Sequence, residues 1–139
     1  MVLTYDPNSV SIIVGGKIVS GYADGSFVKL SRNEQAFNLK IGADGTGTRV
    51  KSNNKSGKLE ITLQQSSASN DDLSAIAGAD ELSNTGVVPL LVRDASGRTL
   101  ATALTAWVQK LPDTEFAHET TNRAWVLETD QLVLFVGGN

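Results

Sequence analysis

The seven residues Lys58–Gln64 alternate strictly between polar and apolar side chains. Leu59, Ile61 and Leu63 fall on one side of an extended chain, and the polar residues between them fall on the other. A period of two predicts a strand with one face in a core and the other face in water. In any fold of this chain, this segment must therefore belong to a sheet that has one face in contact with water.

A helical pattern follows this strand. Apolar residues recur every three or four positions, which predicts one short helix over Asn70–Ala77. Ser69 or Asn70 is expected to cap the helix, because a short side-chain oxygen satisfies an amide that the first turn leaves free. The two aspartates that follow would lie in the first turn, where the helix dipole favours negative charge. Gly78 is expected to weaken or end the helix.

Strand patterns dominate the rest of the chain, with short β-branched and apolar runs separated by turn residues. The expected strands are Val10–Val14, Lys17–Val19, Phe27–Leu30, Ala36–Ile41, Val87–Val92, Leu100–Lys110, Ala124–Glu128 and Leu132–Val136. A chain of 139 residues with 40% hydrophobic residues suffices for one core. The sequence therefore predicts a single, mainly β domain over residues 1–139, a β-sandwich or barrel-like fold with one short flanking α-helix.

Two segments of this pattern are unusual. Residues 42–57 are rich in glycine, serine, asparagine and threonine, which predicts a long polar hairpin or loop at the surface. Leu132–Val136 is apolar on both faces although it lies near the C-terminus, and an uncharged apolar edge strand invites association. This last strand is expected either to lie centrally in the sheet or to be covered by another copy of the chain.

The residues that enzymes use are absent or isolated. The chain has no cysteine and one histidine, His118, which excludes thiolate zinc sites and two-histidine metal sites. No phosphate-binding loop or nucleophile elbow is present. We therefore expect no enzyme activity and no catalytic, cofactor or metal-binding residues. Trp107 and Trp125 are candidates for a carbohydrate platform, but each lies in a strand pattern that favours a core position.

The net charge and the hydropathy of the chain limit the kinds of partner that we expect it to bind. The formal net charge is −3 and the pI is about 5.0, so no global basic field attracts nucleic acid or anionic membrane. The first residues carry neither a basic start nor an apolar run long enough for a signal peptide. The longest strongly apolar run, at the last expected strand, is far shorter than a membrane span. We expect a protein without a membrane anchor that is made in the cytoplasm and is either kept there or assembled there into something larger.

The order of these patterns resembles the tail tube family of contractile-tailed phages, related to the tubes of bacteriocins and type VI secretion systems. The resemblance rests on VSIIVGGKIVSGYADGSFVKLSRNEQAF, GADGTGTR, KSGKLEITLQQSSASNDDLSAI, AWVQKLPD and the final FVGGN. It implies a structural virion protein that forms homohexameric rings, stacked into a conduit through which DNA passes without specific binding. Sheath, baseplate and tape-measure proteins are the implied partners, assembly takes place in the host cytoplasm, and no cofactor is implied.

The resemblance also assigns roles to surface residues. Lumen-facing candidates are Lys58, Glu60, Thr62 and Gln64. Inter-ring candidates in the polar segment are Arg49, Lys51, Asn53 and Lys55. Candidates for a strand between subunits are Leu132, Leu134 and Val136. Two alternatives stay open at this point: another virion β-protein such as a capsid decoration protein, and a carbohydrate-binding module.

Overall fold

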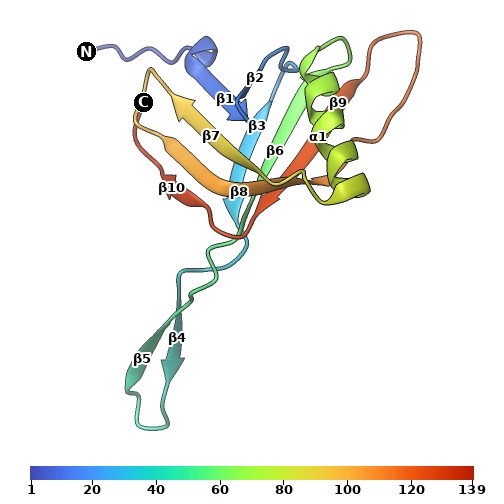
Figure 1. The fold of residues 1–139 in the computed structure, drawn as a ribbon. Helices are drawn as coiled ribbons and strands as arrows, with labels where there is room; N and C mark the ends of the chain where they lie inside the picture. The colour runs from blue at the N-terminus through green and yellow to red at the C-terminus, as the bar shows by residue number, and fades with distance from the viewer.

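The computed structural model describes residues 1–139 and contains ten strands, one α-helix and one 3-10 helix (Figure 1). In chain order the elements are η1 (Pro7–Ser9), β1 (Val10–Val14), β2 (Lys17–Val19), β3 (Val28–Arg32), β4 (Phe37–Ile41), β5 (Gly47–Lys51), β6 (Gly57–Gln64), α1 (Ser69–Ser83), β7 (Val88–Asp94), β8 (Leu100–Lys110), β9 (Asn122–Thr129) and β10 (Val133–Phe135). Every strand that the sequence predicts is present, and β1, β2 and β8 have the predicted bounds.

One antiparallel sheet of eight strands forms the body, in the order β2-β1-β7-β8-β9-β6-β3, with β10 beside β8. The long strand β8 pairs with β7 along its first part and with β9 along its last part, with a register shift between Val108 and Lys110. The sheet bends along β8 so that its two halves face each other (Figure 1). The predicted mainly β, barrel-like fold with one flanking helix is confirmed.

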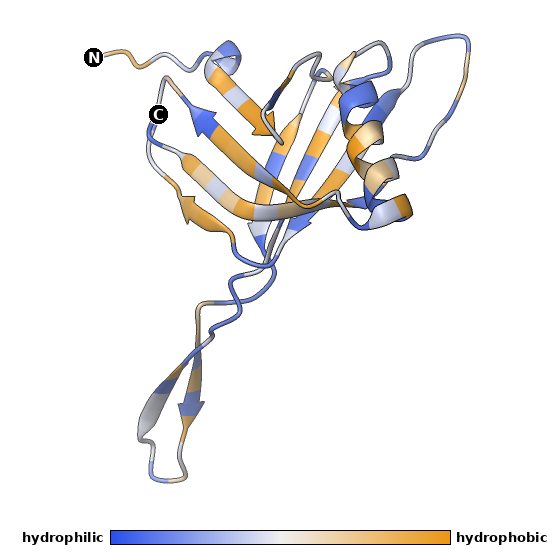
Figure 2. Cartoon of the chain, in the orientation of Figure 1, coloured by the Kyte–Doolittle hydropathy of each residue, from blue (hydrophilic) through white to orange (hydrophobic).

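The hydrophobic core lies between the two halves of the bent sheet. Alternate residues point into it, so hydrophobic and hydrophilic bands follow each other along the strands (Figure 2). Ile12, Leu59, Ile61, Leu127 and Trp125 are each at most 2% exposed. Burial of one such large apolar side chain contributes about 1.5–3 kcal/mol, so this alternation stabilises the fold.

The turn between β1 and β2 follows from the sequence. Gly15 and Gly16 both have positive φ, at 59° and 80°, and Val14 pairs with Lys17 across them. A two-residue hairpin loop of type I′ matches the twist of its strands and needs positive φ at both positions, which glycine adopts at low cost.

The helix α1 is longer than predicted and starts differently. It continues through Gly78, where an added Cβ would meet no atom within 4 Å, and ends before Asn84 in the left-handed region. The cap prediction was wrong: Ala68 is the N-cap residue and makes no side-chain cap bond. Ser67 Oγ accepts from the Ser69 amide instead. Both first-turn aspartates are confirmed. No helix of this protein combines the length and the apolar character that crossing a membrane requires.

The strands β4 and β5 form a separate two-stranded sheet that projects from one end of the body (Figure 1). Residues 42–57 thus divide into a tip, the strand β5 and a connection back to β6. The alternation of Ala36–Ile41 correctly predicted that β4 is a strand. It did not predict that β4 lies outside the main sheet, where every residue of β4 and β5 is exposed. This projecting pair is called the hairpin arm below.

Candidate functional site

The polar face of β6 looks away from the core. Lys58, Glu60, Thr62 and Gln64 lie on one side of the strand, and the leucines and isoleucine between them are at most 1% exposed. Glu60 is paired in register with Lys29 of β3, and Lys58 with Glu128 of β9. Opposite charges therefore alternate across this face, and none of these pairs closes to an ion pair within 4.0 Å. The predicted alternation is confirmed, and the face is hydrated with mixed charge.

The outer face of the other half of the sheet carries many apolar side chains. Register pairs connect Ile18 to Ile13, Ile13 to Leu91, Leu91 to Thr102 and Thr102 to Val133, across β2, β1, β7, β8 and β10. Ile18 is 71% exposed and Val133 58% exposed. We call this surface the apolar face; its members are Ile13, Ile18, Leu91, Leu100, Leu104, Val133 and Phe135. Ser11, Arg93 and Thr102 lie on the same outer side, so polar side chains interrupt the apolar ones. Exposed apolar side chains gathered in this way are typical of interaction surfaces.

The last strand, β10, lies at an edge of the sheet. It pairs only with β8, so the interpretation that placed it centrally is wrong. Of the residues predicted to contact a neighbour, Leu132 is 1% exposed inside this subunit's own core, Leu134 packs against that core and Val136 is 76% exposed. The accessible side chains are therefore those of Val133, Phe135 and Val136, together with the free backbone edge of the strand.

The hairpin arm has one apolar side. Phe37, Leu39 and Ile41 alternate along β4 and pair with Lys51, Arg49 and Gly47 of β5. The Arg49 guanidinium lies over the Phe37 ring, 4.1 Å from its centroid, a cation–π geometry.

The two other residues predicted to contact an adjoining ring lie away from the hairpin arm. Asn53 lies in the connection that returns to the body. Lys55 lies at the base, where its carbonyl accepts from the Leu132 amide at 2.8 Å. The predicted inter-ring set is therefore split between the arm and its base.

The tip of the hairpin arm carries one charged residue, Asp44. Its Oδ1 accepts from the Thr46 amide at 3.0 Å. Hydrogen bonds from Thr46 lower the pKa of the Asp44 carboxyl, first of all the one from the backbone amide. The carboxyl is therefore anionic at neutral pH. The other tip residues are Gly42, Ala43, Gly45 and Thr46, so the tip is slender.

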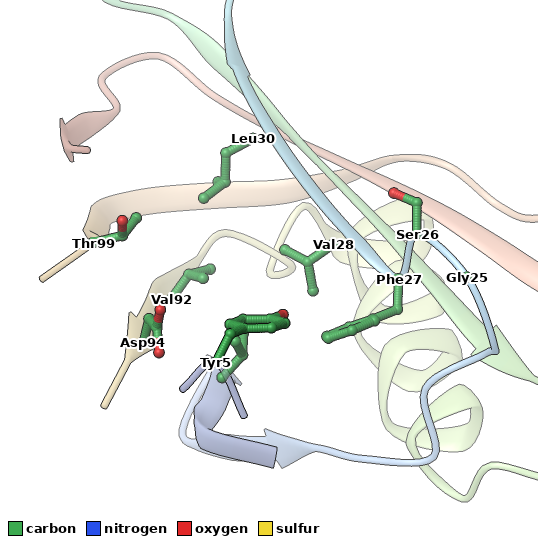
Figure 3. A pocket seen from close by; sticks show the side chains of 10 residues that line it. Tyr5, Gly25, Ser26, Phe27, Val28, Leu30, Val92, Asp94 and Thr99 are labelled. Atoms are coloured by element: carbon green, nitrogen blue, oxygen red, sulfur yellow. The ribbon is translucent and has the colours of Figure 1, made fainter. Parts of the chain in front are cut away.

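A cavity of about 360 Å³ opens where β3 faces β1 and β7 (Figure 3). Tyr5 and Phe27 point into it beside Val28 and Leu30. Its one carboxylate, Asp94, accepts from Ser96, and the Ser96 side-chain hydrogen bond lowers the pKa of Asp94. A carboxyl with a lowered pKa is a poor general base. The lining therefore suits the burial of apolar groups.

The remaining candidates for chemistry are dispersed. No group of three histidine, cysteine or acidic side chains lies close enough to hold a metal ion. His118 is exposed in the loop between β8 and β9, and Trp125 is buried in the core as its strand pattern favoured. The core position favoured for Trp107 is wrong, because Trp107 is only half-buried on the outer side of β8. The features that distinguish this molecule are thus its surfaces: the polar face of β6, the apolar face, the edge of β10 and the hairpin arm.

Comparisons with known proteins agree with this description. Residues 7–137 match the family model described as "Bacteriophage PhiTE tail tube protein". The chain is 31% identical over 144 residues to "Structural protein ORF10" of Pseudomonas phage KPP10, with 98% of this chain and 83% of that protein covered.

Two solved structures share the fold. The sheath/tube terminator of the extracellular contractile injection system PVC, in its extended state, gives a TM-score of 0.62 at 10% identity, over 96% of this chain and 97% of that one. The cap of the anti-feeding prophage, which terminates its tube, gives a TM-score of 0.60 at 10% identity, over 97% and 94%. At this identity the likeness concerns the fold alone.

Proposed function

Because the chain belongs to the bacteriophage PhiTE tail tube protein family, we propose that its copies form hexameric rings that stack into the inner tube of a contractile phage tail. The family match over residues 7–137 carries this proposal. A tail tube protein is a structural component of the virion. The tube would assemble in the host cytoplasm with sheath, baseplate and tape-measure proteins, and would conduct the DNA during ejection.

Two features of the subunit support closure into a ring. The free edge of β10 offers unpaired backbone groups, and Val133 and Phe135 beside it are largely exposed. In the ring a neighbouring copy would cover this edge and the adjoining apolar face. Closure of a ring removes open sheet edges, which otherwise promote uncontrolled association.

The polar face of β6 suits a DNA conduit. Each cationic residue on it is in register with an anionic or neutral residue of a neighbouring strand. A lumen dominated by positive charge would retain DNA, because every neutralised phosphate adds affinity. We therefore assign Lys58, Glu60, Thr62 and Gln64 to the lumen.

Stacking of rings requires a second contact, and the hairpin arm supplies one. It extends beyond the body and exposes an apolar side with Arg49 and Lys51 next to it. In our proposal the arm reaches the adjoining ring, where these cations meet acidic residues.

Electron microscopy tests the assembly directly. Negatively stained purified protein, with light scattering on the same sample, is expected to show rings or hollow tubes. A stable trimer without rings would instead indicate a capsid decoration protein and would contradict the proposal.

The variant Glu60→Lys tests the lumen assignment. It replaces a negative by a positive charge on the proposed lining, so tubes should still form but should retain short duplex DNA with a steep salt dependence. Fluorescence anisotropy of labelled DNA measures this retention. Glu81→Lys makes the same charge change on the exposed side of α1 and should retain little DNA. Equal retention by both variants would contradict the assignment.

A further inference from the structure

Arg123 is the only charged residue buried in the subunit, at 7% exposure. Its position in β9 places it on the core side, two residues before Trp125. Its guanidinium donates to the Thr121 hydroxyl at 2.6 Å and to the carbonyl oxygens of Thr121, Asn122 and Glu115 at 3.2–3.3 Å. The Phe116 ring lies 5.7 Å away. The side chain is thus held in one place by the loop that precedes β9.

No carboxylate neutralises this guanidinium. The one ion pair in the chain joins Lys110 to Asp113. Glu115 offers Arg123 its backbone carbonyl, and the Glu115 side chain is exposed to water. Carbonyl dipoles orient a cation but carry no net charge, and buried charges in proteins are ordinarily paired. The subunit alone therefore leaves Arg123 without a counter-ion.

A pocket of about 520 Å³ opens beside Arg123. Leu111, Phe116 and Trp125 form apolar walls. Gln65 and Ser74 add polar atoms, and the Gln65 carbonyl already accepts from Thr121, which leaves the Gln65 amide nitrogen free. A cation and a free donor in an apolar pocket favour a carboxylate on a slender segment.

The pocket and the hairpin arm lie at opposite ends of the body. The arm leaves β6 at Gly57, whereas Arg123 is paired with Leu63 at the far end of the same strand. Six steps along a strand span roughly 20 Å. The loop that covers the pocket and the hairpin arm point to opposite sides (Figure 1). Subunits stacked head to tail would therefore bring the arm of one copy to the pocket of the next.

The tip of the arm matches the pocket. Asp44 is its one charged residue, and glycine, alanine and threonine surround it. We propose that the Arg123 pocket binds the Asp44 carboxylate of a second copy of this chain, in the adjoining ring. This inference rests on the proposed stacking function and names the contact through which stacking occurs.

Engineered cysteines test this contact, because the chain has no cysteine of its own that could form another disulfide. The pair Ala43→Cys and Thr114→Cys keeps the Asp44 carboxylate and places one thiol beside it at the tip and one at the exposed rim of the pocket. Under mild oxidation, assembled protein should form a ladder of linked subunits on non-reducing gels. The control pair Ala43→Cys and Ser11→Cys has its second thiol on the outer side of β1 and should form no ladder.

A second variant measures the charge contact. Asp44→Asn removes only the charge and should raise the concentration needed for tube formation by about tenfold or more. Asp24→Asn, in an exposed turn, should leave that concentration unchanged.

The contact would be overturned if the cysteine variant formed tubes normally but gave no ladder of linked subunits. It would also be overturned if Asp44→Asn formed tubes at the same concentration as the unmodified protein. Either result would leave the proposed tube function intact. Failure of the unmodified protein to form rings or tubes would overturn both proposals.

Discussion

A subunit whose residues 37–51 are replaced by four glycine and serine residues is expected to fold normally and to form no tubes. No residue of β4 or β5 is buried, so the replacement removes nothing from the core. The base of the arm stays tied to the body by the hydrogen bonds from the Asn33 amide to the Ser56 carbonyl and from the Leu132 amide to the Lys55 carbonyl. We expect a thermal midpoint within a few degrees of the parent and no sedimenting polymer.

Circular dichroism and sedimentation measure these two properties on the same sample. Lys40→Ala is the matched control, because it alters the side of the arm opposite the apolar residues and should leave tube formation unchanged. Full polymerisation of the shortened subunit would show that rings stack without the arm. A collapse of the thermal midpoint would instead show that the arm supports the fold.

The sequence predicted those parts of the fold that depend on neighbouring residues. Alternation defined β6, and the Gly15-Gly16 pair defined the first hairpin turn. The helix was predicted too short because glycine lowers helix propensity by about 1 kcal/mol. At Gly78 the tertiary packing of Leu73 and Ala77 outweighs that cost.

The parts that were missed depend on contacts distant in sequence. Strand β5 was not recognised because an exposed hairpin needs no buried face and so shows no hydrophobic period. Because β9 pairs with only the last part of β8, the first part of β8 is free to pair with β10, which then forms an edge of the sheet. No local pattern in the sequence reveals this arrangement. The apolar face likewise exists only once five strands are in register.

Arg123 could have been found from the sequence. In the strand Asn122–Thr129, the side chains of Arg123, Trp125 and Leu127 lie on the same side. A charged residue on the same side as a tryptophan and a leucine indicates a buried cation. Its missing counter-ion could not be predicted, since fifteen acidic residues were available as partners.

The largest loss of stability is expected from Trp125→Ala. Trp125 is 2% exposed, and its indole nitrogen donates to Asn70 Oδ1 at 2.9 Å. The Asn70 side-chain amide also donates to the Gln64 carbonyl at the end of β6 and to the Ser67 carbonyl of the loop before α1, so the indole connects β9 to the start of the helix. Truncation of a buried tryptophan to alanine costs about 3–5 kcal/mol, a large part of the 5–15 kcal/mol typical of a domain. Urea unfolding monitored by circular dichroism measures the change.

Two further variants separate packing from the hydrogen bond. Trp125→Phe keeps most of the apolar volume but leaves Asn70 without the indole donor, so we expect a loss of about 1–2 kcal/mol. Trp107→Ala truncates a tryptophan that is only half-buried on the outer side of β8, and should cost less than Trp125→Ala. If Trp107→Ala and Trp125→Ala were equally destabilising, the core would not be centred on Trp125. If Trp125→Phe cost as much as the alanine variant, the link to α1, rather than the packed ring, would hold the helix on the barrel.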